Sequence, residues 1–185
     1  MNETIRNILN RRSTRAFSDR QVAKEDVELI VKCGACAANG MDLQPWHFTV
    51  IQSREMLAKI SAEYRKYLAD PKKGAGHRGA GDPEYDCIYG APTLIIVSGE
   101  TDGTIVAVDC GNAVENMAIA ATSLGLGSCF IASVSVVFEG SGASLKEELG
   151  IPEDFVPMFS LALGYADELP PEREERRKDA VNFVW

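Results

Sequence analysis

The sequence predicts an α+β fold, a sandwich in which a mostly antiparallel central sheet is flanked by helices. Stretches with apolar residues at helical spacing alternate with short runs of β-forming residues, in the order helix, helix, strand, helix, loop, strand, helix, strand, helix, strand and tail. The sequence lacks the Gly-x-Gly-x-x-Gly turn of a dinucleotide-binding Rossmann fold. The chain has 185 residues, of which 45% are hydrophobic, so we expect residues 1–185 to form one domain around one core.

The first two elements are predicted helices. Apolar side chains over residues 5–9 share one face of a short helix, which Asn2 or Thr4 would cap and which ends at a group of arginines. Residues 24–36 form a second helix, with apolar residues on one side and acidic residues in the first turn, where they complement the helix dipole.

The next part of the chain is predicted to contain a strand, a helix and a long loop. Residues 47–52 alternate in polarity and are rich in β-formers, and Pro45 stands just before this strand. A third helix follows over residues 53–68, with Ser53 as its N-cap. Residues 70–89 have no periodicity and many glycines, so we expect a lid or a substrate loop there.

A buried strand and a buried helix are predicted next. Residues 93–99 form an unbroken apolar run, which is typical of a central strand covered on both faces. The longest helix is predicted over residues 106–124, and its apolar character nearly all round implies burial on most sides. Asp109, Glu115 and Asn116 interrupt this surface, and we interpret them as capping residues or as satisfied hydrogen-bonding groups of the core.

The remaining core elements are shorter. Gly125 and Gly127 are expected to end the long helix by supplying positive φ. A strand over residues 128–133, a soft loop, a short helix over 145–149 and a last core strand over 156–164 complete the predicted order.

The tail, residues 170–185, is charged first and apolar at its end. Exposed apolar surface is a liability, so we do not expect Val181, Phe183, Val184 and Trp185 to dangle in solvent. The tail is therefore predicted to cross, as an arm, onto a partner subunit.

Charge and hydropathy limit the partners of the protein. The net charge is −8, with 19 Lys and Arg against 27 Asp and Glu, which argues against nucleic acid as the main partner. No apolar run reaches the roughly 20 residues that cross a bilayer, and the polar N-terminus differs from a signal sequence. We expect a cytoplasmic protein that does not enter a membrane.

The cysteines and histidines suggest no obvious catalytic set. Five cysteines in apolar surroundings fit reduced thiols better than a disulfide framework. Cys33 and Cys36 have the Cys-x-x-Cys spacing of redox or metal pairs, but they lie in a helical pattern without a second such pair, so we interpret them as packing residues. We expect no metal site. Only His47 and His77 are available for histidine chemistry, and His77 either contacts a substrate or is simply exposed.

Arginines are concentrated near the N-terminus, against the overall charge. The run RRSTR at residues 11–15 offers three guanidiniums and two hydroxyls, and a guanidinium fork pairs with phosphate through two parallel hydrogen bonds. The same run also suits a solvated helix end or an anion-dependent interaction module, so the residues alone leave these alternatives open. The first twenty residues contain five arginines: Arg6, Arg11, Arg12, Arg15 and Arg20.

Five blocks of sequence carry a resemblance that covers nearly the whole chain. They are RRSTRAFSDRQV, AANGMDLQPWHFTVI, GAPTLIIV, DCGNAVENMAIAATSLGLGSC and LALGY, in this order. With these blocks the sequence resembles the nitroreductase family of FMN-dependent oxidoreductases. The resemblance implies a homodimer of interlocked subunits, with one FMN on each side of the interface.

The resemblance also assigns roles to the arginines. Arg11 and Ser13 would grip the phosphate and ribityl end of FMN, with Arg12 as a helper. Arg15 would reach the N1 and C2 carbonyl edge of the flavin, where a cation stabilises the negative charge of the reduced ring. Arg173 is the first choice for the tail residue that completes the phosphate site. Its rivals are Arg176 and Arg177.

Two further segments are implied to line the flavin. The loop before Gln44 would come from the other subunit, and Gln44 and Trp46 would fix and pack it. The Pro, Ser and Asn that are usual in this loop of the family appear here as Ala38, Asn39 and Asp42. The carboxylate of Asp42 beside a reduced, negatively charged flavin is unfavourable unless it faces away or pairs with an arginine. Backbone N–H groups around Ile131, Ala132 and Ser133 would lie near flavin N5. The implied loop residues are Ala38, Asn39, Gly40, Met41 and Asp42.

The implied function is electron transfer from NADH or NADPH to a flat organic acceptor, such as a nitroaromatic, a quinone or a flavin, by a ping-pong mechanism. Flavin N5 would carry the chemistry, so no catalytic side chain is needed. The loop at residues 70–89 would choose the acceptor. The alternative hypothesis is a flavin-binding or flavin-sequestering protein with little turnover.

Overall fold

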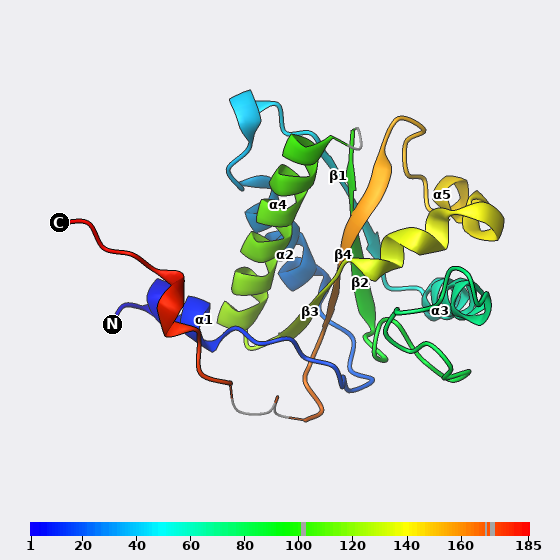
Figure 1. Cartoon of the computed structure of the whole chain (residues 1–185), viewed down its shortest axis with the longest axis horizontal. Coiled ribbons are helices and arrows are strands. Elements are labelled where there is room, and N and C mark those ends of the chain that lie inside the picture. The colour runs from blue at the N-terminus through cyan, green and yellow to red at the C-terminus, as the bar shows by residue number, and fades with distance from the viewer. Residues whose placement is uncertain (101–102, 169, 171–172) are drawn as a thin grey trace.

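A four-stranded antiparallel sheet forms the centre of the protein. The computed structural model describes residues 1–100, 103–168, 170 and 173–185. The strands lie in the order β1 (Trp46–Ile51), β2 (Thr93–Gly99), β4 (Val156–Gly164) and β3 (Gly127–Ile131), and each neighbouring pair is antiparallel. Helices cover both faces (Figure 1). The predicted α+β fold class is therefore confirmed.

The sheet separates two apolar clusters. On one face, α2 (Lys24–Ala35) and α4 (Thr104–Ser123) pack against β2 residues such as Ile95. On the other face, α3 (Arg54–Ala69) and α5 (Ser144–Glu148) pack against Leu94, Ile96 and their neighbours. Successive side chains of a strand point to opposite faces, so the unbroken apolar run of β2 is buried at every position, as predicted for a central strand.

The predicted helices are present, with small shifts at their ends. The Asn2 carboxamide caps α1 (Glu3–Asn10) by accepting from the Ile5 amide at 3.0 Å. The Ser53 hydroxyl caps α3 by accepting from the Met56 amide. The long helix α4 begins at Thr104, two residues before the predicted start. No described helix is long and apolar enough to cross a membrane.

The region after α4 corrects three predictions. Gly125 has a φ of 72°, as expected, but Gly127 does not need positive φ because it is the first residue of β3. Strand β3 ends at Ile131 rather than at Ser133, where a 3₁₀ helix begins. This helix (Ser133–Phe138) and a second one (Gly140–Gly142) occupy the predicted soft loop. Buried Val134 and Val137 hold the first of them against the core, a pattern too short to stand out in the sequence.

The arginine-rich segment lies along the edge strand β3. The Thr14 amide donates to the Ser128 carbonyl at 2.8 Å, and Ser13 forms a parallel bridge with Ser128. Thr14 is buried, and a β-carbon placed on Gly127 would lie 2.6 Å from its hydroxyl oxygen. The absence of a side chain at residue 127 therefore lets the segment approach the sheet.

Residues 70–89 form turns without helix or strand, in agreement with the predicted loop. The loop is nevertheless anchored, because Cys87 and Ile88 are buried in the core and the Tyr85 ring packs at 6.1 Å from the Tyr64 ring. It also contains an overlooked Gly-x-Gly-x-x-Gly match at residues 74–79. This match follows a helix and enters turns, so it is not the Rossmann turn.

The apolar end of the tail is exposed in this single chain, and the cysteines are unpaired. The end of the tail follows a short 3₁₀ helix (Lys178–Ala180), and Phe183 and Trp185 are 71% and 103% exposed. All five cysteines are free thiols. Cys33 is half-buried, but Cys36 is exposed at the end of α2, so the interpretation as a packing residue is wrong for Cys36 in this chain.

The approach of the arginine segment to β3 is testable at Gly127. Gly127→Ala would push the Thr14 side chain away, and we expect it to lower the free energy of unfolding by about 1–3 kcal/mol, measured by urea denaturation. Gly111→Ala is the matched control, because a β-carbon there meets only the Phe159 ring at 3.9 Å inside α4. It should stabilise the protein by about 0.5–1 kcal/mol. Equal effects of the two substitutions would contradict the close approach.

Candidate functional site

Arginines from the two ends of the chain surround one cavity of about 480 Å³. The Arg173 guanidinium donates to the Arg11 carbonyl at 2.5 Å, which brings the tail against the N-terminal segment. The predicted tail residue Arg173 thus lies beside the predicted phosphate residues, and so does its rival Arg176. Arg177 instead pairs with Asp179 at 2.9 Å. The cavity is lined by Arg11, Arg12, Ser13, Arg15, Arg173, Glu174 and Arg176.

The charges around this cavity are unbalanced. Arg11 forms an ion pair with Glu115 of α4, with 2.9 Å between Nε and Oε1, which confirms that Glu115 is a satisfied polar group. Partial desolvation, followed by the neighbouring charges of Arg176, Arg12 and Arg11, lowers the pKa of Arg173. Like charges held this close favour an anionic ligand, and guanidinium forks with a serine hydroxyl suit a phosphate group.

Among the residues that line the arginine cavity, Arg15 is the one that approaches Tyr89. Its guanidinium carbon is 6.0 Å from the centre of the Tyr89 ring, and its side chain is exposed. Arg78, from the loop at residues 70–89, approaches the same ring at 5.7 Å. Neither Arg78 nor Tyr89 was predicted from the sequence to be a site residue. The only available signal was the glycine-rich match that contains Arg78.

The loop at residues 38–44 is tied to the N-terminal half of α4. Buried Asp109 accepts from the Gly40 amide through both carboxylate oxygens, at 3.2 and 3.1 Å. The Asn112 side chain donates to the Ala38 carbonyl at 3.0 Å. The Asn39 side chain accepts from the Gln44 amide at 2.8 Å. Asp109 is therefore a satisfied core group, as interpreted, and Gln44 is held within the loop.

The tip of the same loop is strained and projects outward. Met41, Asp42 and Gln44 have φ values of 53°, 55° and 49°, which residues with side chains rarely adopt. Met41 is 87% exposed at the short 3₁₀ helix η1 (Gly40–Asp42). The Asp42 carboxylate accepts from the Gln44 side chain at 3.2 Å rather than from an arginine of its own chain. Strained backbone is retained where the surroundings impose it, so this loop has the character of a binding element.

The two groups of predicted site residues do not meet within one chain. The loop at residues 38–44 packs on the N-terminal half of α4, through Asp109 and Asn112. The arginine segment reaches α4 through Glu115, and α1 lies against the C-terminal half. Figure 1 shows the loop and α1 at opposite ends of this helix. One chain alone therefore presents two half-sites.

The third predicted segment, around Ile131, lies near the arginine group because β3 pairs with residues 13 and 14. Ile131 is buried, and its carbonyl accepts from the Ser160 hydroxyl at 3.2 Å. Ala132 has helical dihedral angles and Ser133 starts the 3₁₀ helix, so the chain turns away from the sheet at this point. The backbone thus leaves the sheet after Ile131, beyond the part of β3 that pairs with the arginine segment.

The fold and its edge cavity define an α+β protein with a basic cavity beside the edge strand of its sheet. The chain belongs to the nitroreductase family, whose family model matches residues 8–165. The crystal structure of an FMN-bound nitroreductase from Bacteroides fragilis is 31% identical, covers 100% of both chains and superimposes with a TM-score of 0.92. An FMN-bound nitroreductase from Desulfitobacterium hafniense is 30% identical, with a TM-score of 0.90 over 100% of this chain and 99% of that one.

A curated relative extends the comparison. The chain is 28% identical over 190 residues to an FMN reductase (NADPH) from Bacillus subtilis, a match that covers 98% of this chain and 73% of the relative. The resemblance seen in the sequence, including its family, is thereby confirmed.

The anchoring of the loop at residues 38–44 by Asp109 leads to a prediction. Asp109→Ala removes the acceptor of the Gly40 amide, and we expect it to lower the free energy of unfolding by about 1–3 kcal/mol. Hydrogen exchange of the Gly40 amide should become faster. Asp109→Asn keeps one acceptor oxygen and should have a smaller effect on both measurements. Unchanged exchange in Asp109→Ala would mean that this contact does not hold the loop.

Proposed function

We propose that the protein is an FMN-dependent oxidoreductase that transfers electrons from NADH or NADPH to a flat organic acceptor, such as a nitroaromatic, a quinone or a flavin. The observation that carries this proposal is the arginine cavity beside β3. FMN bound to two structures that cover the full chain, and the FMN reductase activity in the name of a relative, support it. A cytoplasmic location fits the free thiols.

The residues of the cavity fit the phosphate of FMN. Its donors are guanidiniums and a serine hydroxyl, and Glu174 is the one carboxylate among its lining residues. Arg11, Ser13 and Arg173 would hold the phosphate, with Arg12 as a helper. The ion pair with Glu115 fixes Arg11 through its Nε, which leaves the terminal nitrogens of the same guanidinium to donate.

The remaining residues would act on the isoalloxazine ring. Bound FMN supplies reversible acceptance and release of electrons at the flavin ring. Arg15 would stabilise negative charge at the N1 and C2 carbonyl edge, and backbone amides around Ile131, Ala132 and Ser133 would donate near N5. The protein binds, orients and excludes solvent, and protons come from water, so no side-chain nucleophile is required. Donor and acceptor would use the same flavin face in turn, in a ping-pong cycle.

A homodimer would join the two half-sites. The loop that includes Ala38, Asn39, Gly40, Met41 and Asp42, with Gln44, would line the flavin held by the arginines of the other chain. This arrangement accounts for the separation of the two groups along α4 and for the outward projection of Met41. Of the arm predicted for residues 170–185, the part beyond Arg173, which contacts its own chain, would lie on the partner. The partner would cover the exposed Phe183 and Trp185.

The proposal and its alternative are separated by one measurement. The purified protein should be yellow or should take up added FMN, and NADH or NADPH should bleach the bound flavin rapidly under anaerobic conditions. Bound flavin that is bleached slowly would favour the alternative hypothesis, a flavin-sequestering protein. A colourless protein without affinity for FMN would overturn both.

The phosphate site can be tested by a matched set of arginine substitutions. Arg11→Gln and Arg173→Gln should each raise the dissociation constant of FMN about 10-fold or more, because each removes a charge-assisted hydrogen bond. Flavin fluorescence quenching measures this constant. Arg177→Gln removes the same charge from a residue that pairs with Asp179 outside the cavity, and it should leave FMN affinity nearly unchanged. Equal losses in all three variants would indicate a general charge effect.

The arm can be tested by truncation. Removal of residues 178–185 deletes the exposed aromatic residues but keeps Arg173 and Arg176. We expect the dimer dissociation constant to rise at least about 10-fold, because burial of one large apolar side chain contributes about 1.5–3 kcal/mol. Analytical ultracentrifugation measures it. An unchanged dimer would show that the arm contributes nothing to assembly.

A further inference from the structure

A glycine-rich segment outside the arginine cavity has no role in the function proposed so far. Residues 74–79, Gly-Ala-Gly-His-Arg-Gly, lie in turns after α3. Gly76 and Gly79 have φ values of 83° and 86°, and a β-carbon on Gly79 would lie 2.2 Å from the Tyr85 ring. Only glycine fits this position, so the turn that carries His77 and Arg78 is docked closely on Tyr85.

Arg78 converges with Arg15 on one aromatic ring. Their guanidinium carbons lie 5.7 and 6.0 Å from the centre of the Tyr89 ring, within the range of a cation–π contact. The segment therefore brings a second cation, from a different part of the chain, to the end of the site where Arg15 lies. Both side chains are exposed and accessible to a ligand.

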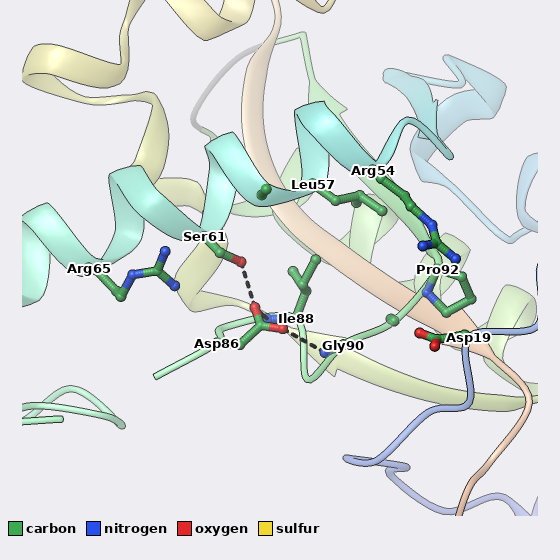
Figure 2. A pocket seen from close by; sticks show the side chains of 11 residues that line it. Asp19, Arg54, Leu57, Ser61, Arg65, Asp86, Ile88, Gly90 and Pro92 are labelled. Atoms are coloured by element: carbon green, nitrogen blue, oxygen red, sulfur yellow. Dashed lines mark hydrogen bonds between the residues drawn. The ribbon is translucent and has the colours of Figure 1, made fainter. Parts of the chain in front are cut away.

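The Tyr89 ring is held in place by a network under α3. Asp86 accepts from the Ser61 hydroxyl and from the amides of Ile88 and Gly90, as Figure 2 shows for Ser61 and Gly90. These bonds fix a turn in which Tyr89 has a φ of 59°, and its hydroxyl lies 3.2 Å from that of Tyr85. Ser61 and Asp86 border a cavity of about 360 Å³, but they already bond each other, so we interpret them as positioning residues for Tyr89.

Both cations also face β3. Burial raises the pKa of the Cys129 thiol on β3, and the charges of Arg15 and Arg78 act in the opposite direction. Such an effect weakens with distance, so the charges of Arg78 and Arg15 act on the same strand.

The charge of Arg78 has no carboxylate partner in the part of the chain that the structure describes, since no ion pair within 4.0 Å involves Arg78 or Arg15. Two more basic residues of the same loop contact a different ring, that of Tyr67, which Tyr64 and Tyr85 separate from Tyr89. The Lys73 ammonium is 5.9 Å from the centre of the Tyr67 ring, and the His77 ring packs edge-on against it at 5.3 Å. Basic side chains spread along one loop favour the approach of a ligand with several negative charges.

We propose that Arg78 is a specificity-determining residue that binds a phosphate group of the reduced nicotinamide dinucleotide. This inference rests on the proposed function, because it assumes a donor that binds beside the flavin. The phosphate of FMN is assigned to a separate cavity, which Arg78 does not line. A dinucleotide whose nicotinamide stacks on the flavin carries its phosphates past the edge of the stacked rings, so an exposed cation at that edge is placed to contact them.

The donor fits these features better than the acceptor does. Nitroaromatics and quinones are flat rings without a phosphate. A flavin nucleotide acceptor would carry one, whereas either donor always carries a pyrophosphate. An exposed guanidinium without a carboxylate partner among the described residues, carried by a glycine-rich turn, suits a pyrophosphate or a ribose phosphate. NADH offers the pyrophosphate alone, whereas NADPH adds the 2′-phosphate.

The test compares Arg78→Gln with Lys72→Gln in the FMN-loaded protein. Lys72 is exposed in the same loop and contributes the same charge, so it controls for a general electrostatic effect. Arg78→Gln should raise the KM for the donor about 10-fold or more and leave kcat within about threefold. The dissociation constant of NADP⁺, read from the absorbance change of bound FMN, should rise in parallel. Arg78→Lys should recover part of the affinity.

Each outcome has a distinct meaning. A rise with both NADH and NADPH assigns the contact to the pyrophosphate, and a rise with NADPH alone assigns it to the 2′-phosphate. A donor KM unchanged in Arg78→Gln, or raised equally in Lys72→Gln, would overturn the inference. A rise only in the KM for a carboxylated nitroaromatic would also overturn it and would place Arg78 at the acceptor. Wild-type protein that binds no FMN would instead defeat the proposed function itself.

Discussion

The short backbone pairing between Thr14 and Ser128 is the contact on which the proposed site depends. It aligns the arginine segment with the edge strand β3, and Gly127 permits it because no side chain stands between the two segments. The arginines therefore lie along the sheet edge in the same order as in the sequence. Arg11 and Arg12 border the cavity that Arg173 also lines, while Arg15 extends toward Tyr89. A single edge contact thus relates the anion-binding end to the proposed redox end.

Helix α4 connects this edge to the rest of the protein. Its polar residues each hold a different segment: Asp109 holds Gly40, Glu115 holds Arg11, and Asn116 donates to the Cys33 carbonyl at 3.2 Å. In an otherwise apolar helix these groups would be costly if they were unpaired. Because these paired residues lie at fixed positions along α4, the helix sets the distance between the two half-sites.

The sequence allowed the main elements to be predicted because their signals are local. The apolar run of β2 and the Ser53 cap of α3 depend on neighbouring residues and are found where expected. Gly127 was misjudged because its glycine serves a tertiary contact rather than a turn. Arg78 was missed for a similar reason, since its approach to Tyr89 depends on how Asp86 folds the loop. The positions of the site arginines came from the family resemblance, as an isolated Arg-Arg-Ser-Thr-Arg run does not specify a ligand.

The division of α4 into two halves has a genetic consequence. If each flavin contacts the arginines of one chain and the loop of the other, a substitution in the arginine segment and a substitution in the loop of the same chain impair different flavin sites. A hybrid dimer of one chain altered at Arg11 and one altered at Asp109 would contain one site with both defects and one site with neither. Two inactive alleles of this protein would then complement each other. Random pairing makes about half of the dimers hybrids with one intact site each, so about a quarter of the activity would return, a property that separates a shared site from two independent ones.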